Sequence, residues 1–108
     1  MSKRKSFQDF VEKIKLAESI KIGDLVSLNP EYKRYHYPIG QAPLYQWSIG
    51  LSGHVTNGTL DYRSTAIVLE VRIYKIEERV KLRTYKLLVD TGIEGWFCDG
   101  GTHLEKQN

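Results

Sequence analysis

The sequence predicts a mainly β protein, a small antiparallel barrel preceded by one short α-helix. Three observations predict this class. Apolar and polar residues alternate with a period of two over residues 67–74, short strand-like segments follow one another between turns rich in Gly, Pro and Asn, and one segment has helical spacing. The 108 residues suit a single domain. Short strands with tight turns do not build a doubly wound sheet, whereas a barrel removes its own unpaired edges.

The N-terminal segment, residues 1–20, is predicted to be a basic tip followed by an amphipathic helix over residues 6–18. Apolar side chains recur there at spacings of three and four, which places them in one stripe. The stripe consists of Phe7, Phe10, Val11, Ile14 and either Leu16 or Ala17. A helix of this length is marginal by itself. It must therefore pack either on its own domain or on a partner chain.

Residues 21–64 are expected to start with a strand and to continue as a long irregular stretch. The strand covers Leu25–Leu28 and ends at Asn29-Pro30, because proline lacks the N–H that a strand ladder needs. Residues 30–64 contain all three prolines, and loops of this length are often functional. Two short strands are expected inside this stretch, Tyr45–Leu51 and Gly53–Asp61, the second folded as a hairpin around Asn57-Gly58.

The C-terminal part, residues 65–106, is predicted to hold the main strands. The alternating strand that includes residues 67–74 reverses at residues 76–79 and returns as a strand over residues 80–90. A turn with two glycines at residues 90–95 leads to a short strand over residues 96–98. Residues 102–105 are expected to add one more strand pairing.

The net positive charge belongs to the N-terminal tip. The chain has 16 Lys and Arg residues against 13 Asp and Glu residues, and Lys3, Arg4 and Lys5 account for the excess of +3. The remaining chain is neutral but divided, since residues 72–86 carry +4 and residues 87–108 carry −3. This division weakens the inference from a basic chain to nucleic acid, and it favours complementary contacts between protein chains.

No motif in the sequence predicts catalysis or metal binding. The three histidines and Cys98 show none of the spacings typical of zinc sites, and no glycine-rich loop has the form that binds phosphate. Cys98 and His103 are either a nucleophile pair or, more simply, a buried cysteine and a surface histidine. Asp90, Glu94 and Asp99 lie around turns, where Asp commonly bonds nearby backbone. The sequence therefore predicts no enzyme, no cofactor, no metal and no small-molecule substrate.

Export and membrane insertion are not expected. The longest apolar runs, such as Ala66–Leu69, are far shorter than the roughly 18 residues of a membrane span. The N-terminal segment is amphipathic, unlike the apolar stretch of a signal peptide. A single cysteine forms no intrachain disulfide, which suits a reducing cytosol.

Several motifs resemble a known family of small barrels. Ile22-Gly23-Asp24-Leu25-Val26 is similar to the first strand of SH3-like and KOW-like barrels. The order of residues 66–71, 85–89, 94–97 and 104–105 resembles these barrels as tailed bacteriophages encode them. The resemblance implies an SH3-like barrel over residues 21–108 with a long loop or hairpin insertion at residues 30–64. It also implies a location in the host cytoplasm or the virion. Thr65-Ala66 departs from the family pattern, which has a glycine there.

The first functional hypothesis is a non-catalytic phage-type structural or assembly protein that binds other protein chains. Its partners would be virion proteins or copies of itself. The resemblance does not select this function, because SH3-like barrels include assembly parts, nucleic-acid binders and peptide binders. Aromatic side chains in loop 30–47 and on the N-terminal helix are the expected contacts, since they offer large apolar areas. They are Phe7, Phe10, Tyr32, Tyr35, Tyr37, Tyr45 and Trp47.

The alternative is a nucleic-acid-binding barrel. Two basic and aromatic segments, residues 32–37 and 72–86, would combine base stacking with phosphate contacts. Their basic residues are Lys33, Arg34, Arg72, Arg79, Lys81 and Arg83. Each segment is also compatible with a structural role, as tyrosines that cover the barrel mouth or as a solvated hairpin face. A third hypothesis, a phage inhibitor of a host protein, uses the same surface.

Overall fold

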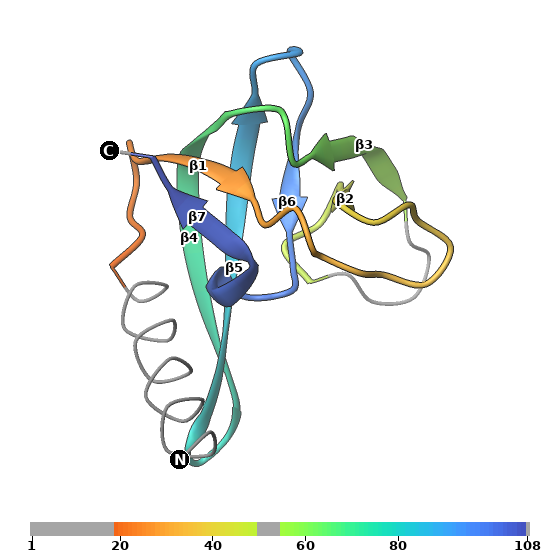
Figure 1. Ribbon diagram of the computed structural model, residues 1–108. Helices are drawn as coiled ribbons and strands as arrows, with labels where there is room; N and C mark the ends of the chain where they lie inside the picture. Colours follow the sequence, from red (N-terminus) through yellow and green to blue (C-terminus); the bar gives the residue numbers. More distant parts are fainter. Residues whose placement is uncertain (1–18, 50–54, 108) are drawn as a thin grey trace, which may run out of the picture.

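The computed structural model describes residues 19–49 and 55–107, which form seven strands and one short 3-10 helix (Figure 1). In chain order these are β1 (Leu25–Leu28), β2 (Gln41–Tyr45), β3 (Thr56–Asp61), β4 (Ala66–Glu77), β5 (Val80–Val89), β6 (Glu94–Phe97), η1 (Gly101–His103) and β7 (Leu104–Lys106). Every strand pair is antiparallel, so the mainly β, antiparallel prediction is confirmed. The helix predicted over residues 6–18 lies outside the described residues. Among those described, no helix is long and apolar enough to cross a bilayer.

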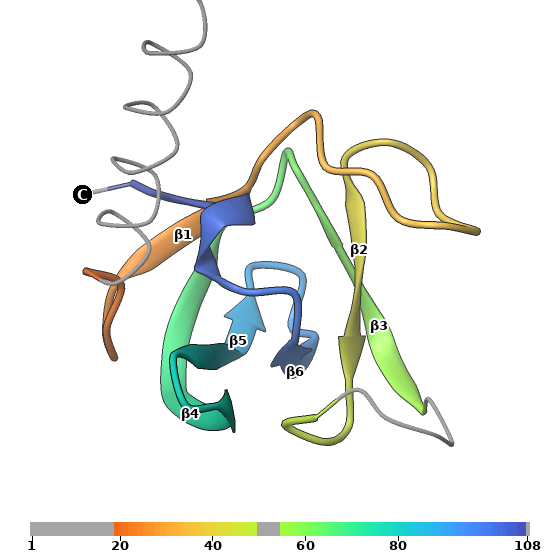
Figure 2. The same ribbon diagram turned by 90° about the horizontal axis from the view of Figure 1, so that it is seen from below.

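The strands form one sheet in the order β3-β2-β6-β5-β4-β1-β7. This sheet curls into a half-barrel, which is visible when the molecule is seen from below (Figure 2). The curl brings β3, at one end of the strand order, into contact with β1 near the other end. Register shifts within the β2–β3 and β4–β5 pairs assist the curl, because a β-bulge bends and twists its strand.

The interior of the curl holds the hydrophobic core. Its largest fully buried apolar side chains come from six strands and are Val26, Leu28, Leu44, Leu60, Val68, Tyr85, Leu87 and Phe97. Each such side chain contributes roughly 1.5–3 kcal/mol through the apolar surface that it removes from water. Tyr32 joins the same core from the connection between β1 and β2, so the start of that connection is fixed by packing.

The long β4–β5 hairpin confirms the strand pair that the alternation predicted, but its faces differ from a simple period of two. A β-bulge between Val68 and Glu70 leaves Leu69 as the extra residue. Before the bulge Val68 is buried, and after it Val71 packs on the core opposite Tyr85. One extra residue exchanges the two faces of a strand. The alternating residues therefore do not lie on one continuous face.

Beyond Val71 and Tyr85 the hairpin continues as a two-stranded extension, residues 72–84, which we call the ribbon (Figure 1). It has no third strand among the described residues, because β1 pairs with β4 only at residues 66–67 and β6 pairs with β5 only at residues 85–88. Residues directly opposite each other point to the same side. The inner face, on the side of Val71, therefore carries Ile73, Lys75, Lys81 and Arg83, and the outer face carries Arg72, Tyr74, Leu82 and Thr84.

The strand predicted at Tyr45–Leu51 is misplaced. β2 is Gln41–Tyr45, so it ends at the residue where the predicted strand begins. Pro43 lies within β2, although proline argued against a strand there. It is tolerated because one side of β2 pairs with β6 only at Tyr45, which leaves most of that side without a ladder.

The hairpin predicted around Asn57-Gly58 is wrong, because both residues lie inside β3. Leu44 pairs with Gly58 and Tyr45 pairs with Thr56, so Asn57 is the extra residue of a bulge. The Asn57 Nδ2 donates a 2.8 Å hydrogen bond to the carbonyl oxygen of Glu94. A Cβ on Gly58 would lie 2.8 Å from the Cδ1 of Ile93, so the neighbouring turn requires glycine. The Asn-Gly pair thus marks a bulge and a close approach of two segments.

Candidate functional site

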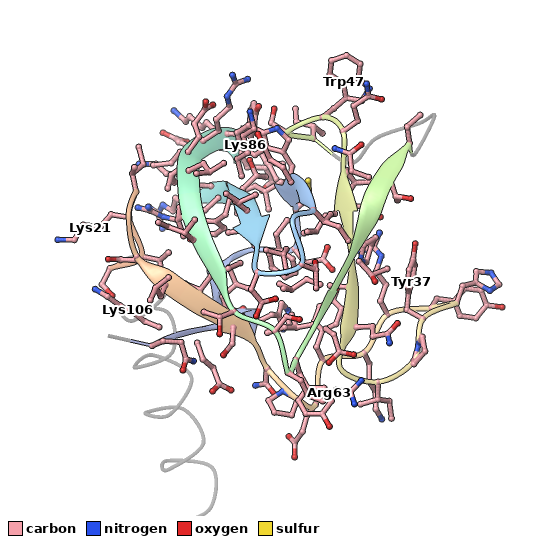
Figure 3. The ribbon with its side chains drawn as sticks, turned by 90° about the horizontal axis from the view of Figure 1, so that it is seen from above. Lys21, Tyr37, Trp47, Arg63, Lys86 and Lys106 are labelled. Carbon is pink, nitrogen blue, oxygen red and sulfur yellow. The ribbon has the colours of Figure 1, made fainter. Side chains whose placement is uncertain are left out.

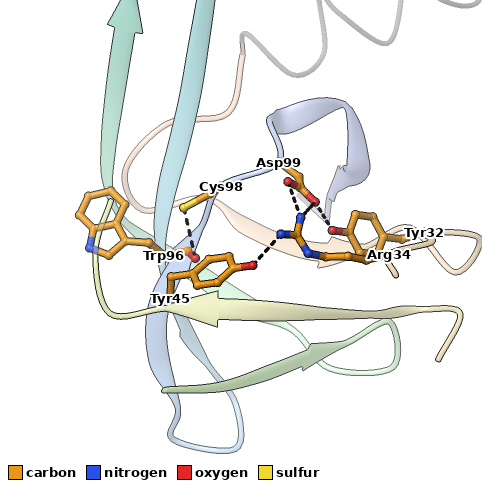
Figure 4. Close-up of polar contacts among 6 residues, drawn as sticks. All are labelled: Tyr32, Arg34, Tyr45, Trp96, Cys98 and Asp99. Atoms are coloured by element: carbon orange, nitrogen blue, oxygen red, sulfur yellow. Dashed lines mark hydrogen bonds and ion pairs between the residues drawn. The ribbon is translucent and has the colours of Figure 1, made fainter. Parts of the chain in front are cut away.

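A polar network on Arg34 fixes the base of the loop between β1 and β2 (Figure 4). One guanidinium nitrogen, Nη1, donates to both carboxylate oxygens of Asp99 at 2.9 and 2.8 Å, and Nη2 donates to the Tyr45 hydroxyl at 2.7 Å. The Tyr32 hydroxyl donates to the same carboxylate of Asp99. The network therefore joins the loop to β2 and to the segment that follows β6.

The surroundings of Tyr32, Arg34 and Tyr45 raise the pKa of each of these three side chains. Burial, together with the hydrogen bond to Asp99, raises the pKa of Tyr32 well above its usual range. Burial also raises the pKa of Tyr45. Burial alone would lower the pKa of Arg34. The hydrogen bonds and the ion pair with Asp99 outweigh this effect and raise the pKa above its usual value. Both phenols therefore stay neutral and Arg34 stays charged at physiological pH, so the charges of these three side chains do not change there.

The anchored aromatic loop, residues 33–39, projects from this base. The residues that flank the loop are joined by a hydrogen bond, since the N–H of Gly40 donates to the carbonyl oxygen of Tyr32 at 2.8 Å. Gly40 has a positive φ of 84°, and a Cβ there would lie 2.6 Å from a ring carbon of Tyr62. Glycine is therefore required at this position both for its backbone conformation and for space.

The tip of the loop presents aromatic rings to solvent. Tyr35 is 85% exposed, and its ring centroid lies 4.1 Å from that of His36. His36 has a left-handed backbone with φ of 71°, a conformation that is uncommon for a residue other than glycine. Figure 3 shows Tyr37 on the same projecting segment. A shallow depression of about 420 Å³ is lined by Lys33, Arg34, Tyr35, His36, Tyr37 and Ile39.

The structure divides the predicted protein-binding residues into three groups. Tyr32 and Tyr45 are only 4% and 6% exposed, and they anchor the loop from inside. Tyr35 and Tyr37 lie on the projecting loop, and Trp47 is exposed on another side of the molecule (Figure 3). Phe7 and Phe10 lie outside the described residues. Partner contact by any of these side chains stays a prediction.

Trp47 belongs to a second surface, over the outer face of the ribbon. The next residue, Ser48, is hydrogen-bonded to the hydroxyl of Tyr74. The Arg72 guanidinium lies 5.2 Å from the ring centroid of Trp96 and forms a 2.6 Å ion pair with Glu70. This cation–π contact covers Trp96, which is buried.

The basic residues predicted for nucleic acid do not form one surface. Arg34 is neutralised by Asp99 in the loop base, and Lys33 lies beside it on the exposed loop. Arg72 is on the outer face of the ribbon, whereas Lys81 and Arg83 are on its inner face and Arg79 is at its turn. On the inner face the basic residues end at Arg83, because the next residue of β5 on that face, Tyr85, is fully buried.

Cys98 and His103 have separate surroundings. The Cys98 Sγ donates to the carbonyl oxygen of Ser48 at 3.4 Å, and the His103 ring packs edge-on against Tyr32 with centroids 5.2 Å apart. Within residues 19–49 and 55–107, no three His, Cys, Asp or Glu residues are placed to hold a metal ion.

Sequence reasoning missed two residues of this site. Asp99 was expected to bond nearby backbone, yet its carboxylate holds Arg34 and Tyr32, and no local signal identifies a partner 65 residues away. Ile39 is 61% exposed and lines the depression, although it lies between Pro38 and Gly40 and within no recognisable motif. No protein-family model matches the chain, and comparisons with curated proteins and with solved structures found no match.

Proposed function

We propose that this chain is a small SH3-like barrel of the kind encoded by tailed bacteriophages, and that it is a non-catalytic structural or assembly protein. It acts in the host cytoplasm or in the virion, where it binds a virion protein or another copy of itself. The order of the motifs between Ile22 and Glu105 supports the family, and the curled antiparallel sheet is consistent with it.

The observation that carries the binding role is the exposure of Tyr35 on a loop with a fixed base. A tyrosine that is 85% exposed would normally be mobile, but here Arg34, directly before it, is held by Asp99 and Tyr45. A preorganised loop loses little conformational entropy on binding, and tyrosine gives large contact area with few rotatable bonds. The anchored aromatic loop thus has the properties of a protein-binding surface.

The test compares variants of Tyr35 and Ile39 on the loop with a variant of Ile76, an equally exposed isoleucine elsewhere. The tagged full-length chain captures its partner from cells that naturally make it, and the affinity for the purified partner is then measured for three variants. Tyr35→Ala and Ile39→Ala should each weaken binding by about 30-fold, as central interface residues do. Ile76→Ala is the control, because Ile76 is 60% exposed, against 61% for Ile39, and lies on the ribbon.

Two results would contradict the proposal. One is a chain that captures no protein and remains monomeric at high concentration. The other is an Ile76→Ala variant that loses as much affinity as Ile39→Ala, since the binding surface would then lie elsewhere.

A nucleic-acid-binding role is the second candidate, and one observation favours it. Lys33 lines the same depression as Tyr35, His36 and Tyr37, so a phosphate contact and stacking rings lie together. Binding of a labelled 20-nucleotide single strand should then weaken steeply with salt. Lys33→Glu should abolish it, whereas the exposed and distant Lys21→Glu should not. No binding at low salt would remove this candidate.

The third candidate, a phage inhibitor of a host protein, uses the same loop. The identity of the captured partner separates it from the assembly role. A host protein that loses its activity on binding supports inhibition, and a particle component supports assembly.

A further inference from the structure

The tip of the anchored aromatic loop is a hydrogen-bonded turn over residues 34–37, in which the N–H of Tyr37 donates to the carbonyl oxygen of Arg34 at 3.0 Å. His36 is the third residue of this turn and has a φ of 71°, whereas the φ of Tyr35 is not positive. This combination is typical of a type II turn, whose third residue is preferentially glycine or asparagine. Histidine is therefore less suited to this position than either of those residues.

The ring contact of His36 does not account for a histidine in the turn. The ring lies against that of Tyr35, with the centroids 4.1 Å apart, but both side chains are exposed. The contact therefore buries little apolar surface. Uncommon backbone conformations are concentrated at binding sites, where they fix the position of a side chain. The backbone of His36 thus points to a binding role for its imidazole ring.

Lys33 gives this part of the loop its positive charge. Lys33 and Arg34 are the only Lys or Arg residues in the stretch 32–60, which contains no Asp or Glu. Arg34 is neutralised by its ion pair with Asp99. Lys33 is exposed and forms no ion pair within the part of the chain that the structure describes. Its ammonium group is therefore available to an acidic partner.

We propose that the depression at the loop tip binds an acidic segment of a partner protein, with one carboxylate held between the Lys33 ammonium and an N–H of the His36 imidazole. Both side chains line this depression of about 420 Å³. An ammonium forms strong charge-assisted hydrogen bonds with a carboxylate, and an imidazole has an N–H to donate in either protonation state. Tyr35 lines the same depression and offers its ring to apolar atoms of the segment. This inference rests on the proposed function, because it assigns a chemistry to the partner of the same loop.

A carboxylate suits this site better than a nucleic-acid strand. Strands are held through several phosphates at once, so their binding grooves combine several basic side chains. In the loop, both terminal nitrogens of Arg34 already donate to Asp99 and Tyr45 (Figure 4). The remaining ammonium, that of Lys33, matches one carboxylate rather than a row of phosphates.

Synthetic peptides test the charge preference on the unaltered full-length chain. The first probe is a fluorescein-labelled 12-residue peptide in which Glu and Ala alternate, and the second replaces every Glu by Gln. The Glu peptide should bind at least about tenfold more tightly, since only its carboxylates form charge-assisted hydrogen bonds with Lys33. Equal binding of the two peptides, or binding of neither, would overturn the proposal. A labelled strand of 12 thymidines is the third probe, and tighter binding of this strand than of the Glu peptide would overturn it in favour of nucleic acid.

Substitutions in the loop separate binding from folding. His36→Gly should leave the thermal midpoint unchanged or raise it, because glycine is preferred at a positive φ. The same variant should bind the Glu peptide about tenfold more weakly, and so should Lys33→Gln, since each loses a donor to the carboxylate. Lys21→Gln removes an exposed lysine outside the loop and is the control. A lower midpoint in His36→Gly, or peptide binding that changes as little in Lys33→Gln as in the control, would overturn the proposal.

The affinity of the captured partner distinguishes this site from the wider proposed function. A partner that loses affinity in Tyr35→Ala and Ile39→Ala, but not in Lys33→Gln and His36→Gly, would leave protein binding by the loop intact and overturn only the acidic site. A chain that captures no protein and stays monomeric, yet binds the Glu peptide through Lys33, would contradict the proposed function and support the site.

Discussion

The carboxylate of Asp99 accepts two hydrogen bonds from a single nitrogen of Arg34, 65 residues earlier in the chain, at 2.9 and 2.8 Å. Because Arg34 directly precedes Tyr35, this ion pair fixes the chain at the residue before the exposed ring. The same carboxylate accepts a hydrogen bond from the Tyr32 hydroxyl, whose ring lies in the core. Loop position and core packing are thus connected through one acidic side chain.

Replacing that acid should loosen the loop. Asp99→Asn keeps the shape but loses the charge, so we expect a loss of about 1–2 kcal/mol in the free energy of unfolding. Urea denaturation measures the loss, and trypsin should cleave faster after Lys33. Glu105→Gln removes the same charge from the exposed β7 edge and serves as the control. Equal stability of both variants would show that the ion pair does not hold the loop.

Gly40→Ala should destabilise the protein more than Gly92→Ala. Both glycines have a positive φ, 84° and 94°, so both variants pay for the left-handed backbone. Only at Gly40 would the new Cβ meet a neighbour, at 2.6 Å from Tyr62. We expect a loss of about 1 kcal/mol for Gly92→Ala and about 2–3 kcal/mol for Gly40→Ala in the free energy of unfolding. Similar losses would mean that Tyr62 moves aside freely.

Thr84→Val should stabilise the protein. Thr84 is fully buried, and its hydroxyl has no hydrogen-bond partner within the described part of the chain. Valine has nearly the same shape and leaves no polar atom to desolvate, so the free energy of unfolding should rise by about 1 kcal/mol. A thermal melt should show a midpoint about 4 °C higher. Thr59→Val, on exposed β3, is the control, and a lower midpoint for Thr84→Val would contradict this prediction.

Acid should weaken the fold through Asp61. The side chain and the backbone N–H of Arg63 donate to its carboxylate, which lowers its pKa from 3.8 to about 2. As the pH falls, the unfolded chain binds this proton before the folded chain does. The contribution of Asp61 to the free energy of unfolding is therefore present above about pH 4 and is lost between about pH 4 and pH 2. Asp24 contributes with the same sign, because the Lys21 N–H donates to its carboxylate and lowers its pKa.

Urea denaturation at pH 7, 4, 3 and 2 measures this dependence. Asp61→Asn should flatten the decline between pH 4 and pH 2, because it no longer releases a proton on folding. Asp90→Asn, which removes an exposed carboxylate, is the control. An unchanged decline in Asp61→Asn would assign the acid sensitivity to other groups.

Prediction from the sequence succeeded where the signal was local. The strand over Leu25–Leu28 and the β4–β5 hairpin follow from alternation and from β-branched residues at neighbouring positions. It failed at β2 and β3, where Pro43 and Asn57-Gly58 indicated loop and turn. Both elements are decided by partners far along the chain, since β2 lies beside β6 and Gly58 lies against Ile93.

The site shows the same division. The cluster of aromatic and basic residues at positions 32–37 was evident as a candidate surface. The sequence did not indicate which rings face inward, because Tyr32 and Tyr35 both have polar or charged residues beside them. Tyr32 enters the core and donates a hydrogen bond to Asp99, whereas Tyr35 has no such partner within the described residues and is exposed to solvent.

The sequence by itself determined the antiparallel β class, the main hairpin and the division of charge along the chain, because these depend on residue type and on spacings of a few positions. Only the tertiary structure decided the bulge at Leu69, the outward position of Tyr35 and the exposure of Ile73 on the inner face of the ribbon. Each of these arises where segments distant in sequence meet, and packing and hydrogen bonding across such contacts outweigh the local preferences of the residues involved.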